Sequence, residues 1–152
     1  MMDGENEKLK KQRYNNLYMD LANRIADMSH ARRLHVGAII VKDANIISFG
    51  WNGMPAGWDN NCEDEIKWPN GDIKFLKTKP EVLHAETNAI AKLAKSTESG
   101  LDSTLFVTHS PCLDCAKLVY QSGINTVYYR NSYRNDDGIH FLEKAGVHVE
   151  KI

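Results

Sequence analysis

The sequence predicts a three-layer α/β/α sandwich around a mixed five-stranded sheet. From residue 104 onward, strand-like and helix-like segments alternate, which favours parallel strands with helices packed on the sheet faces. Before residue 52, two β-rich runs are joined by a short turn, which favours an antiparallel pair. A chain of 152 residues has room for one hydrophobic core, so residues 1–152 are expected to form a single domain.

The first half of the chain is expected to contribute one helix and two strands. Apolar residues recur at helical spacing within residues 11–29, which predicts an amphipathic helix. The runs VGAIIV (36–41) and IISFGW (46–51) are rich in β-forming residues, and KDAN between them indicates a hairpin turn. Residues 53–83 carry six glycines and prolines and little periodicity, so we expect a long loop that covers a site or an interface.

The second half is expected to supply three helices and three strands. AETNAIAKLAK (85–95) has the apolar spacing of a helix. Strands are expected at residues 104–109, 126–130 and 147–152, with helices between them at residues 112–122 and 137–145. Gly123 and Gly146 follow these two helices at positions typical of a C-terminal cap.

Composition and charge limit the possible functions. The chain is 42% hydrophobic, and no apolar run approaches the roughly 20 residues that a membrane span needs. The N-terminus, MMDGENEKLKKQR, lacks the apolar core of a signal peptide, so we expect a cytoplasmic protein, in the host cytoplasm if a phage encodes it. A net charge of -1 argues against a dedicated nucleic-acid binder and remains compatible with a small anionic ligand.

Two of the three cysteines indicate a metal site. Cys112 and Cys115 lie in HSPCLDCAK (109–117), at the start of a predicted helix. Residues at i and i+3 share one helix face, and a helix N-terminus favours the thiolate form that binds metal. His84 stands at the start of the preceding predicted helix. One imidazole and two thiolates suit tetrahedral zinc with a fourth position open for water, as in catalytic sites.

Glu86 is a candidate for the proton transfer that such a site needs. Zinc brings the pKa of bound water to about 7, and a neighbouring carboxylate can carry the released proton to a leaving group. H-x-E followed by P-C-x-x-C is the signature of zinc-dependent nucleobase deaminases, and here residues 87–110 separate the two parts. A redox dithiol would leave His84 and Glu86 without a role. A closed structural zinc site would need a fourth ligand, such as Cys62 or another histidine.

Several segments together carry a resemblance to a known family. They are RLHVGAIIV, GWNGMPAG, NCED, HAETNAIAK, SPCLDCAKLVYQSGI and, more loosely, the tail YR...DDGIHFLEKAGV. From about residue 33 to the last strand, the chain resembles bacterial and phage deoxycytidylate (dCMP) deaminases of the cytidine deaminase-like superfamily. The resemblance implies the cytidine deaminase-like fold and the hydrolysis of dCMP to dUMP and ammonia. It also implies that His84, Cys112 and Cys115 bind zinc and that Glu86 shuttles protons.

The resemblance further implies contacts to the substrate. Asn52 matches an asparagine that binds the sugar hydroxyl in related enzymes, although a residue before a glycine also suits a turn. Ser110 and the backbone of Ala85 flank the zinc ligands and are expected near the pyrimidine. Lys92 and Lys95 are candidates for the 5′-phosphate, in one chain or in a neighbouring site of an oligomer; otherwise they form a solvated helix face.

Assembly and regulation are also implied by the resemblance. The family is often hexameric, activated by dCTP with Mg²⁺ and inhibited by dTTP. GWNG resembles the family's effector motif, so Trp51, Asn52 and Gly53 are candidate effector contacts, although Trp51 equally suits a core position. Arg33 matches a basic position that could meet a triphosphate. A second zinc site, known in some phage relatives, is not expected, because Cys62 is the one further cysteine.

Other functions remain open from the sequence alone. H-x-E and P-C-x-x-C also occur in deaminases that act on tRNA or single-stranded nucleic acid, which need an extended cationic and stacking surface. The net charge of -1 disfavours such polymeric partners. A free nucleoside, or dCTP, is an alternative substrate to dCMP. A zinc-stabilised binding module without chemistry is the alternative from another class, and it predicts that Glu86→Gln has no effect.

Overall fold

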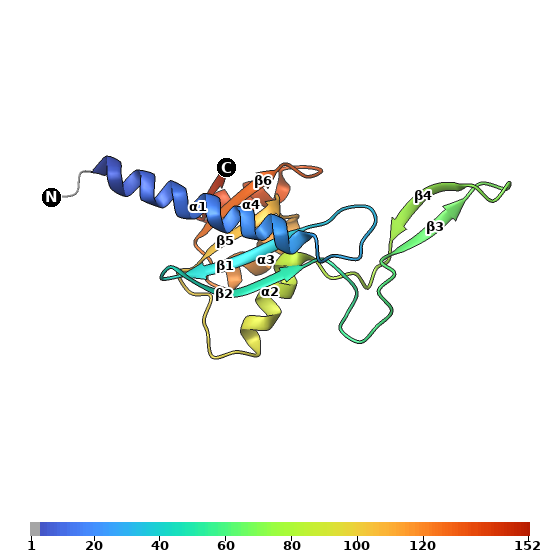
Figure 1. The fold of residues 1–152 in the computed structure, drawn as a ribbon, viewed down its shortest axis with the longest axis horizontal. Coiled ribbons are helices and arrows are strands. Elements are labelled where there is room, and N and C mark those ends of the chain that lie inside the picture. Colours follow the sequence, from blue (N-terminus) through green and yellow to red (C-terminus); the bar gives the residue numbers. More distant parts are fainter. Residues whose placement is uncertain (1–3) are drawn as a thin grey trace.

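The computed structural model describes residues 4–152, and its centre is a five-stranded sheet in the order β2-β1-β5-β6-β7 (Figure 1). The strands are β1 (Gly37–Lys42), β2 (Asn45–Trp51), β5 (Thr104–His109), β6 (Thr126–Asn131) and β7 (His148–Lys151). β1 pairs antiparallel with both β2 and β5, whereas β5, β6 and β7 run parallel. The predicted mixed sheet, with its antiparallel first pair, is confirmed.

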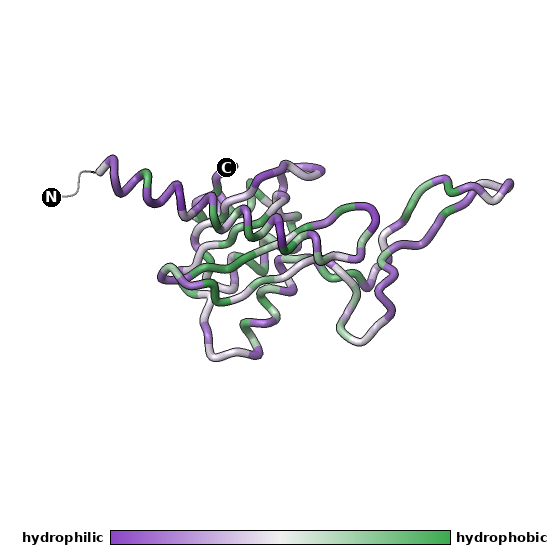
Figure 2. The backbone as a smooth tube through the Cα atoms, viewed as in Figure 1, coloured by the Kyte–Doolittle hydropathy of each residue, from purple (hydrophilic) through white to green (hydrophobic). Residues whose placement is uncertain are grey.

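Helices cover both faces of this sheet. They are α1 (Gly4–Ala26), α2 (Ala85–Ala94), α3 (Leu113–Gln121) and α4 (Asp137–Lys144). Because side chains alternate along a strand, Ile39 and Phe106 pack with α1 on one face, while Ile40 and Leu105 pack with α2 and α3 on the other. Figure 2 shows the hydrophobic segments gathered along the central strands. The predicted three-layer fold class is therefore confirmed.

None of the helices described in residues 4–152 is long and apolar enough to cross a membrane. Helix α1 differs in extent from the predicted 11–29, because it begins at Gly4 and ends at Ala26. The added N-terminal turns consist mainly of charged residues that favour helix but carry little apolar periodicity. The other predicted helices and strands of the sandwich begin and end within one residue of the observed ones.

The segment at residues 53–83 is not loop throughout, which corrects the prediction. It contains an antiparallel hairpin of β3 (Glu63–Lys67) and β4 (Ile73–Thr78), called here the arm (residues 63–78). Figure 1 shows the arm projecting away from the sandwich. Most arm residues are exposed, so the two strands lack the apolar–polar alternation of a half-buried sheet. Backbone hydrogen bonds between Gly53 and Leu83, at 3.0 and 2.8 Å, close the base of the whole segment.

Candidate active site

Three metal-binding side chains meet where two helices begin. His84 is the N-cap residue of α2, Cys112 is the N-cap residue of α3, and Cys115 lies in the first turn of α3. Helix α3 follows the carboxyl end of β5, while α2 packs against β2 and β1, so the sheet brings both helix starts to one edge. Gly50 allows the close approach of α2, because a Cβ there would lie 2.6 Å from the carbonyl oxygen of Ala85.

The distances within this cluster suit a metal ion. His84 Nδ1 lies 3.2 Å from Cys115 Sγ and 3.6 Å from Cys112 Sγ, and the three donor atoms lie within 4.8 Å of one another. Tetrahedral zinc, with bonds of about 2.0–2.3 Å, separates its nitrogen and sulfur ligands by roughly 3.5–3.8 Å. The structure thus positions His84, Cys112 and Cys115, the predicted ligand set, to bind one metal ion.

The electrostatics of the cluster favour metal binding as well. Hydrogen bonds from Cys115 and His84 lower the pKa of Cys112 to about 4, so Cys112 carries the thiolate of the pair. The hydrogen bond with Cys112 and burial raise the pKa of Cys115. The hydrogen bond with Cys112 also raises the pKa of His84, against the effect of burial. A bound divalent cation would favour the deprotonated forms of Cys115 and His84, because these are the forms that bind metal.

Glu86 lies beside the cluster on the first turn of α2. Its side chain is only 4% exposed, and burial raises the pKa of its carboxyl group. It nevertheless lines the same cavity as His84 and Cys112. A buried carboxyl group at the edge of a cavity, next to a metal-binding cluster, has the placement required of a general acid–base group.

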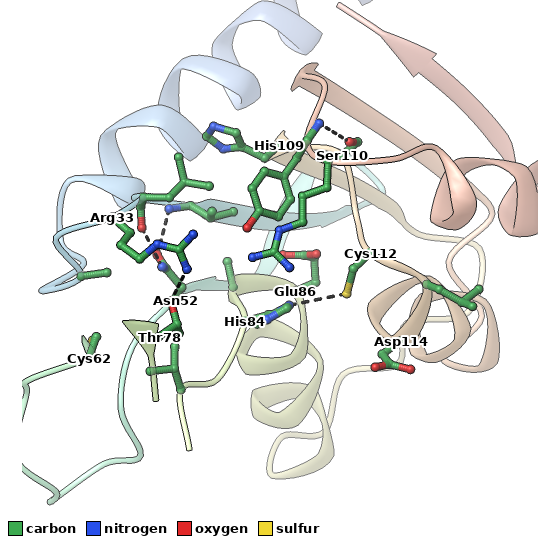
Figure 3. A pocket seen from close by; sticks show the side chains of 18 of the residues that line it. Arg33, Asn52, Cys62, Thr78, His84, Glu86, His109, Ser110, Cys112 and Asp114 are labelled. Atoms are coloured by element: carbon green, nitrogen blue, oxygen red, sulfur yellow. Dashed lines mark hydrogen bonds between the residues drawn. The ribbon is translucent and has the colours of Figure 1, made fainter. Parts of the chain in front are cut away.

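The cavity beside the cluster has a volume of about 800 Å³, within the usual range for small-molecule sites. Its lining comes from the loop before β1, the residue that follows β2, the base of the arm, the start of α2, and the segments that follow β5 and β6. Figure 3 shows His84 and Cys112 on one side of this space and Arg33 with Thr78 on another. One wall of the cavity therefore holds the metal-binding cluster, and a second wall carries the positively charged side chain of Arg33.

Comparison with known proteins shows which family this site belongs to. Residues 12–131 match the family described as "Cytidine and deoxycytidylate deaminase zinc-binding region". The chain belongs to this deaminase family. The resemblance read from the sequence motifs is thus confirmed, and the matched region contains His84, Glu86, Cys112 and Cys115.

Individual proteins of known name, two of them deaminases, are similar along most of the chain. A crystal structure of the dCMP deaminase from cyanophage S-TIM5, in complex with dCMP and dUMP, is 44% identical, covers 100% of both chains and has a TM-score of 0.79. The deoxycytidylate deaminase of Enterobacteria phage T4 is 33% identical over 86% of this chain and 86% of its own. ComE operon protein 2 of Bacillus subtilis is 36% identical over 91% of this chain and 71% of its own.

Three residues expected near the substrate of this deaminase do line the cavity: Asn52, Ala85 and Ser110. The Asn52 side chain accepts a hydrogen bond from the backbone N–H of Val36 and donates one to the carbonyl oxygen of Leu34, each at 2.8 Å. Ser110 Oγ accepts from the backbone N–H of Tyr133 at 2.9 Å. Both side chains therefore brace cavity walls, and their contact with a substrate remains a prediction.

The two lysines expected at the phosphate lie elsewhere. Neither Lys92 nor Lys95 lines the cavity. Lys92 Nζ donates to the carbonyl oxygen of Phe49 at 2.7 Å and lies over the rings of Phe49 and Trp51, 4.3 and 5.3 Å from their centroids. Lys92 thus holds α2 against the edge strand β2. Within one chain of this deaminase, these lysines are therefore outside the cavity that holds the metal-binding cluster.

The candidate effector residues are divided among three places. Arg33 and Asn52 line the same cavity as the metal-binding cluster. Trp51 is half-buried on β2, and its carbonyl oxygen accepts a hydrogen bond from Asn88 Nδ2 at 2.8 Å. Gly53 closes the base of the 53–83 segment through its backbone. The assignment of these four residues to an effector remains a prediction.

Other cavity residues were not singled out from the sequence. They come from the arm and from the connection between β6 and α4: Glu63, Lys77, Thr78, Tyr133 and Arg134. Arg134 stacks on Tyr133, with its guanidinium carbon 5.0 Å from the ring centroid. The connection follows the carboxyl end of β6, next to β5 in the sheet, and such strand ends are where α/β folds place ligand sites. This preference for the carboxyl ends of strands was the one feature from which this part of the site could have been predicted.

Proposed function

We propose that the protein catalyses the hydrolytic deamination of dCMP to dUMP and ammonia. The observation that carries this proposal is the convergence of His84, Cys112 and Cys115 beside the buried carboxyl group of Glu86 at one cavity. Family membership and the relatives named for this reaction, one of them solved with dCMP and dUMP, support the choice of substrate.

The ligand set is proposed to hold zinc, which when bound lowers the pKa of a water molecule to about 7. Glu86 accepts the proton of the attacking water and delivers it to N3 of the pyrimidine while oxygen adds to C4. Glu86 then moves a second proton to the amino group, the C4–N4 bond breaks, and ammonia leaves. The buried position of Glu86 keeps this proton transfer away from bulk water.

The 5′-phosphate needs a cationic partner at the far end of the cavity. Arg33 and Arg134 both line it, from the loop before β1 and from the segment after β6. We propose that the phosphate lies between these two arginines, which assigns Arg33 to the substrate rather than to an effector. Lys92 and Lys95 remain candidates only for a neighbouring site of an oligomer. A guanidinium group suits this role because its N–H groups match two phosphate oxygens at once.

Regulation and assembly complete the proposal. Activation by dCTP with Mg²⁺, inhibition by dTTP and a homohexameric state follow from the resemblance to the family. We also propose that the whole chain forms one deaminase domain acting in the cytoplasm. Initial rates measured at increasing dCMP, with and without each effector, test the regulation, and light scattering coupled to size exclusion measures the assembly.

The deciding experiment is a substrate panel followed by the loss of absorbance that accompanies deamination. We expect turnover of dCMP, with lower kcat/KM for CMP, dCTP and deoxycytidine. Ammonia release in a coupled assay gives an independent measure. No turnover of any of these substrates by zinc-loaded protein would refute the proposed function. Efficient turnover of deoxycytidine alone would refute the nucleotide preference.

A further inference from the structure

The carboxylate of Glu63 is buried at the junction between the arm and the sandwich. Its side chain is 1% exposed although it begins β3 on a segment whose other residues are mostly exposed. Oε2 accepts the backbone N–H groups of Arg32 at 2.8 Å and Arg33 at 2.9 Å, and Oε1 accepts that of Arg32 at 3.1 Å. One acidic side chain thus fixes two consecutive peptide groups of the loop before β1.

The two arginines held by Glu63 have different surroundings. The Arg32 guanidinium is 3.0 Å from Glu65 Oε1, and its Nε is 3.9 Å from Glu63 Oε1, so carboxylates of the arm already neutralise it. The Arg33 guanidinium donates to the neutral hydroxyl of Thr78 at 2.9 Å. Among the described residues it forms no ion pair. Arg33 therefore presents in the cavity a guanidinium group that has no carboxylate partner of its own.

The base of the arm holds Arg33 at both ends. Glu63 and Thr78 are partners in the register of β3 and β4, so they lie directly opposite each other. Glu63 binds the Arg33 backbone, and Thr78 binds the Arg33 guanidinium, as Figure 3 shows for the second contact. An arginine side chain in solution samples many rotamers, and fixing both ends removes much of that freedom before a ligand arrives.

We propose that Glu63 is a positioning residue that selects for phosphorylated substrates by holding Arg33 in place for the 5′-phosphate. This inference rests on the proposed function. Glu63 itself does not bind the phosphate, because its carboxylate is occupied by the two peptide N–H groups and would repel an anion. Its contribution acts through Arg33 and supports the binding of a nucleotide rather than the reaction at the base.

Steady-state kinetics on dCMP and deoxycytidine separate this role from a merely structural one. We expect Arg33→Ala to raise KM for dCMP about ten- to a hundredfold, the value of a hydrogen bond to a charged group, with little change in kcat. Glu63→Ala should raise KM for dCMP about tenfold. Glu63→Gln should raise it by a smaller factor, because the amide keeps one accepting oxygen. In every variant, kcat/KM for deoxycytidine should stay at the wild-type value.

A double variant and a matched control sharpen the test. In the Arg33→Ala background, Glu63→Ala should add no further increase in KM for dCMP, since its effect passes through Arg33. Glu65→Gln is the control, because Glu65 pairs with Arg32 and does not contact Arg33. It should leave KM for dCMP unchanged. Thr78→Val removes the guanidinium contact alone and should raise KM severalfold, about the value of one hydrogen bond.

Each alternative has a distinct outcome. Equal loss of kcat/KM for dCMP and deoxycytidine in Glu63→Ala would overturn the inference and assign Glu63 a structural role. An unchanged KM for dCMP in Arg33→Ala would also overturn it, while leaving the deaminase activity in place. Wild-type protein inactive on every substrate would instead refute the proposed function. If circular dichroism shows that Glu63→Ala does not fold, the test relies on Glu63→Gln and Thr78→Val instead. An unchanged KM for dCMP in both of these variants would reject the inference.

Discussion

Replacement of Glu86 by glutamine tests the proposed chemistry most directly. The side chain is 4% exposed and sits in a packed position, and glutamine has nearly the same volume, so the fold should be retained. The amide cannot accept the proton of the attacking water. General acid–base groups contribute about 10²–10⁴ in rate, so kcat should fall by that factor, or about 3–5 kcal/mol in activation free energy.

The assay combines single-turnover absorbance on dCMP with a zinc measurement on the same sample. We expect Glu86→Gln to retain one zinc per chain and a wild-type melting temperature, because the three ligands are intact. Glu98→Gln, an exposed position outside the cavity, provides the matched control and should behave as wild type. A Glu86→Gln variant with kcat within threefold of wild type, roughly 0.65 kcal/mol, would refute the assigned role and favour a zinc-stabilised module without chemistry.

Three further changes probe the site. Cys115→Ala removes a ligand that is 2% exposed, so bound zinc should be lost and the melting temperature should fall; stoichiometric zinc in mass spectrometry would contradict the ligand assignment. Gly138→Ala places a Cβ against the carbonyl oxygen of Pro111 and 2.9 Å from the carbonyl carbon of Cys112, so zinc should dissociate faster in a chelator-competition assay. Burial lowers the pKa of His109, so the unfolded chain binds the proton more readily and stability should decline as pH falls below about 6.5; His109→Gln should flatten that decline in urea titrations, and an unchanged slope would count against it.

The metal-binding cluster could be predicted from the sequence because its residues are tied to helix starts. His84 and Cys112 are N-cap residues, and the elements around them follow a regular alternation of strands and helices. Once the order of the elements was correct, the two helix starts had to meet at one edge of the sheet. Glu86 lies two residues beyond His84 on the same helix, so a correct position for His84 also predicted that Glu86 lies at the site.

The cavity wall that carries Arg33 could not be predicted in this way, and the family resemblance had indicated Arg33 only as a candidate effector contact. Arg33 and Arg134 lie in loops, and Thr78 ends strand β4 of the arm, so the three are far apart in the sequence and none belongs to a periodic element of the sandwich. Lys92 seemed a reasonable phosphate contact because it follows the H-x-E motif on the same helix. Its position on α2, however, directs it to the carbonyl oxygen of Phe49 and away from the cavity.

The strands of the arm were not predicted, for a physical reason that also bears on the proposed role of the arm at Arg33. A strand whose two faces are both solvated has no hydrophobic face, and so it lacks the periodic signal of a sheet that covers a core. Freed from core packing, β3 and β4 can present charged and polar side chains on any position, such as the acidic residues of β3 beside Arg32.

The proposed roles in chemistry and in substrate selection therefore fall to different parts of this molecule. The metal-binding cluster and Glu86 are held by helices that are packed on the central sheet, where small displacements are strongly resisted. The charge at Arg33 is held by hydrogen bonds to Glu63 and Thr78, at the base of an arm that projects from the sandwich. We therefore expect substitutions at the arm base to alter the preference for dCMP over deoxycytidine without moving Glu86, whereas Gly138→Ala should act through the metal-binding residues.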